Sequence, residues 1–259
     1  MQEQKIPLFQ SGNLVKYEML ELLKKFESDF SELQYIGYAD GVIRGCDVTV
    51  ADTMLIVNKG IILIEGIPFM VNMPVTVNYH STNVIKHLVV RGGEWLEDRN
   101  YKKRYVDFLL VDSDKMIDSD IEICRFRLQQ GARLRYEYRD FNDMDTEYDT
   151  VCLAYARWGA LGNNSIAFTI LKYFAKEMIG AKLRNEEDKM FINQIYALNG
   201  ETLPLDGIRS YLTQRLNRWC MEYSCGEAYK GLKEVLRLVK AEKEPLNTKS
   251  VRERRILVD

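Results

Sequence analysis

The fold is decided by residues 54–71, which read MLIVNKGIILIEGIPFMV. Three short apolar runs stand in this stretch, separated by Asn58-Lys59-Gly60 and by Glu65-Gly66. Runs of four to seven residues joined by glycine-containing turns are typical of an antiparallel β-meander, because glycine adopts the positive φ that tight hairpins require. The stretch therefore predicts a β-rich module with hairpin turns at both interruptions.

The same composition continues on both sides of this stretch. From Tyr35 to Arg91 the chain is dominated by Val, Ile, Thr and Tyr, the residues that favour strands. Pro68 and Pro74 lack the backbone N–H that a β-ladder uses, so we expect them at strand starts or sheet edges. Further strands are expected at Val75–Tyr79, Val84–Val90, Tyr105–Val111 and Ile121–Tyr138.

The N-terminal segment predicts an arm and a helix. Ile6-Pro7-Leu8-Phe9 reads as an extended arm, since proline fixes its own φ and disfavours helix in the residue before it. Asn13 is expected to cap a helix that runs to about Glu27. One side of this helix is apolar and consists of Leu14, Tyr17, Leu20, Leu23 and Phe26.

Beyond about Thr150 the apolar residues recur at helical spacing, which predicts four helices. Ser165 is expected to cap the first and Asp206 the third, while Asn199-Gly200 ends the second and Pro245 the fourth. The second helix is expected over Glu186–Leu198, and the fourth from Gly226 to about Ala241. The apolar residues that share a face are, in the first helix, Ala167, Ile170, Leu171, Phe174 and Met178; in the third, Ile208, Leu212, Leu216 and Trp219; and in the fourth, Ala228, Leu232, Val235 and Val239.

These elements predict an α+β protein with a leading helix, an N-terminal antiparallel β-rich module and a C-terminal region of about four helices. We place a domain boundary near residue 150, where the period changes after the acidic segment Asp140–Asp145. Residues 1–150 would form the β-rich assembly module, and residues 151–259 a helical domain with a polar tail. For the tail Asn247–Arg255, docking and disorder both fit, with disorder in isolation ranked first.

Composition excludes several classes of function. The chain has 259 residues and a net charge of −2, which argues against a nucleic-acid protein that relies on a positive field. Its basic tail, Lys249 with Arg252, Arg254 and Arg255, is interrupted by Glu253 and has no interleaved aromatic residues. No apolar run approaches the roughly 20 residues that span a bilayer, and the N-terminus has no signal-peptide layout. We therefore expect no membrane insertion and synthesis in the cytoplasm.

No catalytic or metal-binding constellation is predicted, and no cofactor. The two histidines, His80 and His87, lie seven residues apart and would face opposite sides of a strand, so they are not expected to share a metal. Both are expected at the surface or an interface. The cysteines are best explained as buried free thiols, because they are odd in number and scattered; they are Cys46, Cys124, Cys152, Cys220 and Cys225.

Two further motifs receive a structural interpretation. The acidic segments Asp112–Glu122 and Asp140–Asp149 lack the glycine and the terminal Glu of a calcium loop at EF-hand spacing, so solvated loops are expected there. The segment Gly159–Ser165 opens a helix but lacks the Lys-Ser/Thr ending of a phosphate loop, which indicates a helix-capping loop.

A family resemblance rests on two glycine-dependent segments. Residues 38–48 read YADGVIRGCDV and residues 55–66 read LIVNKGIILIEG, with Gly60 and Gly66 at the turn positions. The stretch from about residue 6 to 135 resembles the β modules that join fibres and baseplate parts in tailed bacteriophages and phage-tail-like particles such as bacteriocins. Residues 122–126, EICRF, are similar to the strand with which such modules often continue. A receptor-binding tip would carry a longer, repetitive β-rich C-terminal part, so the resemblance implies a connector or baseplate component.

Three hypotheses follow. The first is a structural, non-enzymatic component of a phage tail or tail-like particle that binds other tail, baseplate or fibre proteins and copies of itself. It would reside in the bacterial cytoplasm during assembly and afterwards in the particle. For its interface we weigh the hairpins around Ile61–Ile64 and Phe69–Val71 equally against an ordinary closed core. The alternatives are a carbohydrate-binding module, which needs grouped exposed aromatic residues, and a hydrolase, which needs two converging carboxylates.

Overall fold

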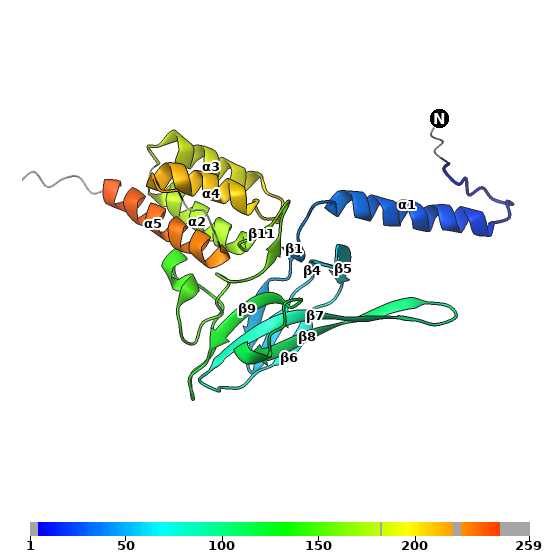
Figure 1. Cartoon of the computed structure of the whole chain (residues 1–259), viewed down its shortest axis with the longest axis horizontal. Helices are drawn as coiled ribbons and strands as arrows, with labels where there is room; N and C mark the ends of the chain where they lie inside the picture. The colour runs from blue at the N-terminus through cyan, green and yellow to red at the C-terminus, as the bar shows by residue number, and fades with distance from the viewer. Residues whose placement is uncertain (1–4, 182, 220–223, 244–259) are drawn as a thin grey trace, which may run out of the picture.

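A computed structural model describes residues 5–181, 183–219 and 224–243 (Figure 1). The four helices of the second half gather at one end, the strands occupy the middle, and the leading helix extends away at the other end. The α+β class, the leading helix and the four C-terminal helices are thus confirmed. Cys220, Pro245 and the tail Asn247–Arg255 lie outside the described residues.

The meander is present, and it consists of three long bent strands that span residues 41–51, 54–64 and 67–78. Each long strand contributes one half to a five-stranded sheet and the other half to a three-stranded sheet. In the first sheet the order is β11-β10-β1-β4-β5, and in the second it is β2-β3-β6. The halves are β1 (Gly41–Gly45), β2 (Val48–Ala51), β3 (Met54–Val57), β4 (Gly60–Ile64), β5 (Ile67–Val71) and β6 (Val75–Asn78).

One of the two predicted hairpin turns is wrong. Asn58-Lys59-Gly60 is a bend within the second long strand, and the chain reverses instead at Asp52-Thr53, where Asp52 has a φ of 51°. Gly60 serves close approach, because a Cβ there would lie 2.5 Å from the backbone of Cys46. The prediction for Glu65-Gly66 is confirmed, since both residues have the positive φ of a tight hairpin, 52° and 74°.

Both prolines lie where their missing N–H is tolerated. Pro68 belongs to β5, which is the edge of the five-stranded sheet, and Pro74 comes directly before β6, the edge of the three-stranded sheet. This confirms the expectation from the sequence.

A third sheet has the order β8-β7-β9. Its strands are β7 (Ile85–Glu97), β8 (Lys102–Asp112) and β9 (Ile121–Arg127). The predicted strand at Val84–Val90 was too short, since β7 and β8 continue as a hairpin that projects beyond the other strands (Figure 1). The prediction over Ile121–Tyr138 was too long. The strand ends at Arg127, and the chain turns soon afterwards at Gly131, which has a φ of 80°.

The second half begins with a short hairpin, β10 (Trp158–Gly159) and β11 (Asn164–Ser165). This hairpin replaces both the capping loop and the phosphate loop considered for residues 159–165. It joins the first sheet, because β10 pairs in parallel with β1 through Val42 and Trp158. Ser165 consequently lies in a strand and does not cap a helix.

The four helices are α2 (Phe168–Gly180), α3 (Glu186–Ala197), α4 (Leu205–Leu216) and α5 (Cys225–Lys243). Asp206 lies in the first turn of α4 and is not its cap, contrary to the prediction from the sequence. Pro204 occupies the N-cap position. Trp219 is exposed beyond the end of α4, because Asn217 adopts a left-handed conformation with a φ of 47° and ends the helix. The other predicted stripes of α2, α4 and α5 face the core.

The core is a continuous cluster of apolar side chains drawn from strands and helices. Its aromatic centre joins the helices to the 3-10 turn η2 (Phe141–Asp145), since the Phe174 ring lies 5.6 Å from that of Phe141, and the Tyr229 hydroxyl donates to the Phe141 carbonyl at 2.6 Å. The division at residue 150 stays a prediction. The strands β10 and β11, from beyond that residue, belong to the sheet of the first half.

Candidate assembly surface

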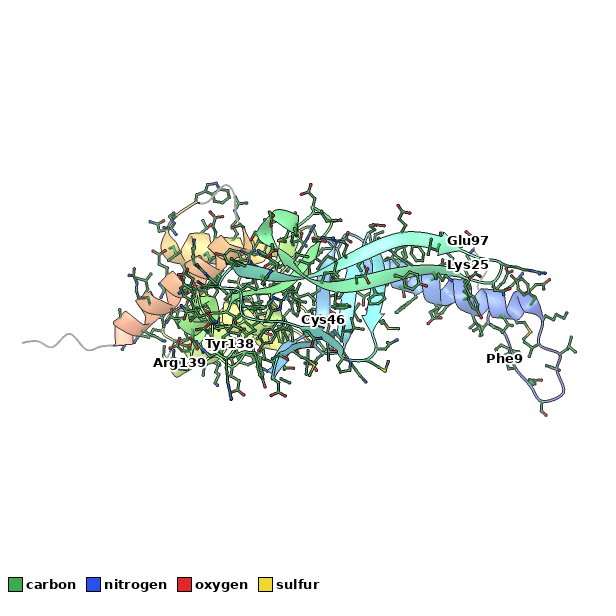
Figure 2. The ribbon with its side chains drawn as sticks, turned by 90° about the horizontal axis from the view of Figure 1, so that it is seen from below. Phe9, Lys25, Cys46, Glu97, Tyr138 and Arg139 are labelled. Carbon is green, nitrogen blue, oxygen red and sulfur yellow. The ribbon has the colours of Figure 1, made fainter. Side chains whose placement is uncertain are left out.

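Helix α1 (Tyr17–Tyr35) starts and ends later than predicted. Lys16 occupies the capping position without a side-chain hydrogen bond, so Asn13 is not the cap. All of α1 lies in the described part of the chain, and none of its residues is buried. Figure 2 shows Lys25 of α1 far from Tyr138 and Arg139 in the body. The apolar side of this helix is therefore open.

The open side has a regular spacing. Met19, Leu23, Phe26, Phe30 and Leu33 follow one another at intervals of four, three, four and three residues. The exposed fractions of Phe26, Phe30 and Leu33 are 63%, 58% and 67%, and the Phe26 and Phe30 rings stack at 6.3 Å. We call these five residues the α1 stripe. The sequence prediction includes Leu23 and Phe26 but not Met19, and it misses Phe30 and Leu33 because it ends the helix at Glu27.

The arm before α1 also exposes apolar side chains. Ile6, Leu8 and Phe9 are exposed. A hollow of about 590 Å³ beside α1 is lined by Lys5 of the arm and by residues that are mostly charged, namely Glu18, Glu21, Leu22, Lys24, Lys25, Ser28 and Asp29. The arm thus approaches the charged side of the helix, and the α1 stripe does not line this hollow.

The projecting β7–β8 hairpin extends toward the same end of the molecule as α1 in both views (Figures 1 and 2). It exposes Trp95, Leu96, Tyr101 and Tyr105. Lys102 and the guanidinium of Arg104 lie 5.2 Å and 5.8 Å from the Trp95 ring, as in cation–π pairs. The hairpin is therefore a second, mixed aromatic and basic surface.

The strands proposed for an interface divide between core and surface. Ile62, Leu63 and Ile64 are buried, so the closed-core interpretation holds for them. On the edge strand β5, Ile67 and Met70 are exposed while Val71 is buried. Only the outward side chains of β5 remain as a contact surface.

His87 is buried and not at the surface as predicted, whereas His80 is exposed. The His87 Nδ1 lies 3.1 Å from the Glu122 carboxylate and its Nε2 lies 2.8 Å from the Ser113 hydroxyl. Burial raises the pKa of Glu122, but hydrogen bonds from His87 and Arg125 outweigh this effect and lower it.

This Ser–His–Glu order is the one that serine hydrolases use. Here, however, Arg125 donates to both Glu122 oxygens at 2.5 Å and 2.6 Å, so the carboxylate forms an ion pair with Arg125. Ser113 lies at the exposed start of the 3-10 turn η1 (Ser113–Lys115). The hollows beside α1, at α5 and at residues 128–134 are lined by other residues. The cluster fastens the turn after β8 to strands β7 and β9.

The acidic segments are not simply solvated, contrary to the prediction. Asp120 is buried and accepts two hydrogen bonds of 2.7 Å from Arg91, and Asp143 is buried against Arg135 at 2.5 Å. The hydrogen bond from Arg135 holds the pKa of Asp143 well below its usual range. Across residues 5–181, 183–219 and 224–243, no three His, Cys, Asp or Glu side chains gather as a metal site would require.

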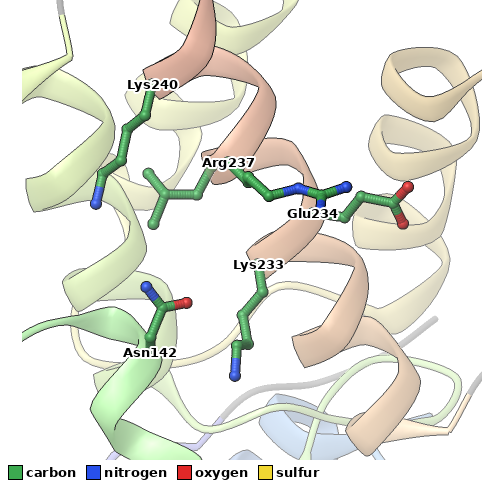
Figure 3. Close-up of a pocket in the computed structure, with 6 residues that line it drawn as sticks. Asn142, Lys233, Glu234, Arg237 and Lys240 are labelled. Carbon is green, nitrogen blue, oxygen red and sulfur yellow. The ribbon is translucent and has the colours of Figure 1, made fainter.

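A hollow of about 570 Å³ lies between α5 and the η2 turn (Figure 3). Figure 3 shows that Lys233, Arg237 and Lys240 extend from α5 and that Asn142 faces them from the turn. Lys233 is already paired with Asp145 at 2.8 Å, and Lys240 with Glu177. Most of the positive charge around this hollow is therefore neutralised by carboxylates of the same chain.

The thiols of Cys46, Cys124 and Cys152 are free and buried, as predicted, and Cys225 is free and half-buried. Burial raises the pKa of Cys46 to about 12 and that of Cys152 to about 11, which keeps both protonated. None of the helices in the described ranges is long and apolar enough to cross a membrane.

No protein-family model and no curated protein matches the chain. Its fold is similar to a crystal structure of TssK, with a TM-score of 0.45 and 8% identity over 94% of this chain and 73% of that chain. It is also similar to a chain of the TssK–TssF–TssG baseplate subcomplex of the type VI secretion system, with a TM-score of 0.40 and 9% identity over 93% and 100%.

A chain of a type VI secretion baseplate complex gives a TM-score of 0.39 and 8% identity over 90% of this chain and 100% of that chain. At such identities and scores, the likeness concerns the course of the chain alone.

Proposed function

We propose that this chain is a structural component of a phage tail or tail-like particle, at the baseplate or a fibre connection. Its partners are neighbouring tail, baseplate or fibre proteins and copies of itself. The observation that carries the proposal is α1, a helix of 19 residues that buries none of its own side chains and exposes a regular apolar stripe. Large exposed apolar patches mark interaction sites, because leaving them in water is unfavourable.

Several described side chains that could perform chemistry instead hold the fold together. Glu122, Asp120 and Asp143 are each bound by an arginine, and the buried thiols are protonated. The resemblance of residues 6–135 to phage connector modules supports the same role. The chain would be made in the cytoplasm of the producing bacterium and would then be carried in the particle.

The test is incorporation into particles. In a bacterium that encodes this chain, its gene would be deleted and replaced by a tagged copy, and sedimented particles would be imaged and analysed by mass spectrometry. We expect the deletion to abolish complete particles and the tagged chain to co-sediment with them in a fixed ratio. A Ser113→Ala copy should restore assembly fully. Complete particles formed without the chain would overturn the proposal.

Carbohydrate binding is the second candidate, and the exposed Trp95, Tyr101 and Tyr105 of the β7–β8 hairpin favour it. Aromatic rings bind sugars through their open faces, whereas Lys102 and Arg104 lie against the Trp95 ring. A glycan array with the purified chain and a Trp95→Ala variant separates the two functions. Binding that depends on Trp95 would favour the carbohydrate function.

A further inference from the structure

We propose that α1 forms a parallel helical bundle with α1 of other copies of this chain, with the α1 stripe as its seam. The inference rests on the proposed function and names the partner of that surface.

The period identifies a helix as the occupant. Spacings of four and three residues average 3.5, the repeat with which two α-helices remain in contact along their length. Leu23 and Phe30 take the a positions of this heptad, and Met19, Phe26 and Leu33 the d positions. A membrane surface fits less well, because interfacial helices carry a basic polar face. The acidic residues of α1 outnumber its lysines; they are Glu18, Glu21, Glu27, Asp29 and Glu32, against Lys24 and Lys25.

The charges beside the stripe select the parallel direction. In a parallel bundle, each g position faces the following e position of its neighbour. Leu22 then faces Glu27, and Asp29 faces Gln34, so no like charges meet. In an antiparallel pair, flanking positions face their own kind, which sets Glu27 against Glu27 of the other copy. Like charges so placed are destabilising.

The stripe is also wide enough for more than one neighbour. At the start of α1 the flanking positions are themselves apolar, with Leu20 at e and Leu22 at g. An apolar face that includes a, d and e or g is typical of helix bundles, whereas a two-stranded coiled coil uses a narrower seam.

The apolar side of α1 supplies a large part of an interface. Five exposed side chains are available on each copy, namely Leu20, Leu23, Phe26, Phe30 and Leu33. At roughly 100 Å² each, about half of what a large side chain can bury, they supply about 500 Å² per copy. Standard protein interfaces bury about 800 Å² on each partner, so α1 alone supplies a little over half of that area.

The first experiment measures the mass of the full chain by light scattering and sedimentation across a dilution series. We expect multiples of 30.2 kDa for the wild type and a monomer for the double variant Phe26→Glu/Phe30→Glu. The matched control is Lys25→Glu, which changes the net charge by the same −2 at the outward c position and should keep the oligomer. The protomer fold should survive in both, because α1 contributes nothing buried to it.

The second experiment tests direction by oxidative crosslinking. In a parallel bundle, equivalent a positions meet, so Leu23→Cys should form a dimer through its own thiols. Glu21→Cys, at the outward f position, should not crosslink. Wild type oxidised in the same way gives the background from the native thiols, of which Cys46, Cys124 and Cys152 are buried and Cys225 is half-buried.

Three outcomes would overturn the inference: a monomeric wild type, an oligomer that survives Phe26→Glu/Phe30→Glu, or an oligomer without the Leu23→Cys crosslink. A monomeric chain that still enters particles would refute the bundle and leave the proposed function standing. Conversely, a self-associating chain that particles do not need would refute the proposed function alone.

Discussion

Helices α1 and α2 carry the same kind of amphipathic sequence, yet the apolar face of α1 is open and that of α2 is buried. In α2, the side chains Ile170, Leu171, Phe174, Ala175 and Met178 are buried beneath α3, α5 and η2. In α1, Leu23, Phe26, Phe30 and Leu33 of the stripe are exposed and Met19 is half-buried, so none of the five is buried within the protomer. Periodicity therefore reports that a helix has a face to bury, and tertiary structure decides whether the same chain or another one covers it.

The largest expected effect sharpens this contrast through one phenylalanine in each helix. Phe174→Ala should lower the free energy of unfolding by about 3–5 kcal/mol, because it opens a cavity among Phe141, Phe191 and Tyr211. Phe30→Ala should change it by less than about 0.5 kcal/mol when measured on dilute monomer. Urea denaturation of both variants gives the two values. Comparable losses would show that α1 packs on its own protomer.

The next effect compares two glycines at different places. Gly60→Ala should destabilise the chain by about 1–3 kcal/mol, because the new methyl would lie 2.5 Å from backbone atoms at the strand bend. Gly12→Ala, in the arm, meets no neighbouring atom and bears only the strain of a φ of 87°, about 1 kcal/mol. Thermal unfolding of both variants tests the order, which should not reverse.

A pH titration tests the ion pairs that stabilise the body of the protein. Hydrogen bonds from Arg135 and from Lys86 lower the pKa values of Asp143 and Asp112 below 3.8 in the folded chain. The unfolded chain therefore binds protons more readily, so this stabilisation is complete above about pH 5 and is lost as pH falls through the folded pKa values. Asp143→Asn should be less stable at pH 7 and should show a shallower fall in acid. A parallel curve would contradict this account.

The smallest expected effect concerns the projecting hairpin. Trp95→Ser should leave the free energy of unfolding within about 0.5 kcal/mol, because the ring is half exposed and its cation–π pairs with Lys102 and Arg104 lie on the projecting hairpin. Denaturation midpoints of the variant and the wild type provide the measurement. A loss above 2 kcal/mol would place the hairpin in the folding unit of the core.

The sequence predicted the elements better than their partners. Alternation and helical spacing are local, so the runs 54–57 and 67–71 and the stripes of α2 and α5 were located closely. Sheet membership depends on contacts far along the chain. Nothing local marks Asn58-Lys59-Gly60 as a bend or joins Trp158 to Val42.

The candidate surface was half visible for the same reason. Leu23 and Phe26 were identified as an apolar side, but exposure is a property of the whole fold and has no sequence signature of its own. The spacing of Phe30 and Leu33 would have extended the helix, had its end not been set at Glu27. The ion pairs of Asp120 and Asp143 were not predicted either. Arg91 is far from Asp120 in the sequence, and no motif distinguishes Arg135 from the other arginines.

The bend at Gly45 and Gly60 has a consequence for how the strands open. These two glycines are paired opposite each other, and every long strand passes from one sheet to the other at this level. Because the same three strands run through both sheets, breaking the hydrogen bonds of one sheet also displaces the strands of the other. Amide protons in residues 41–78 should accordingly exchange with solvent as one cooperative block, with a shared opening free energy on both sides of the corner.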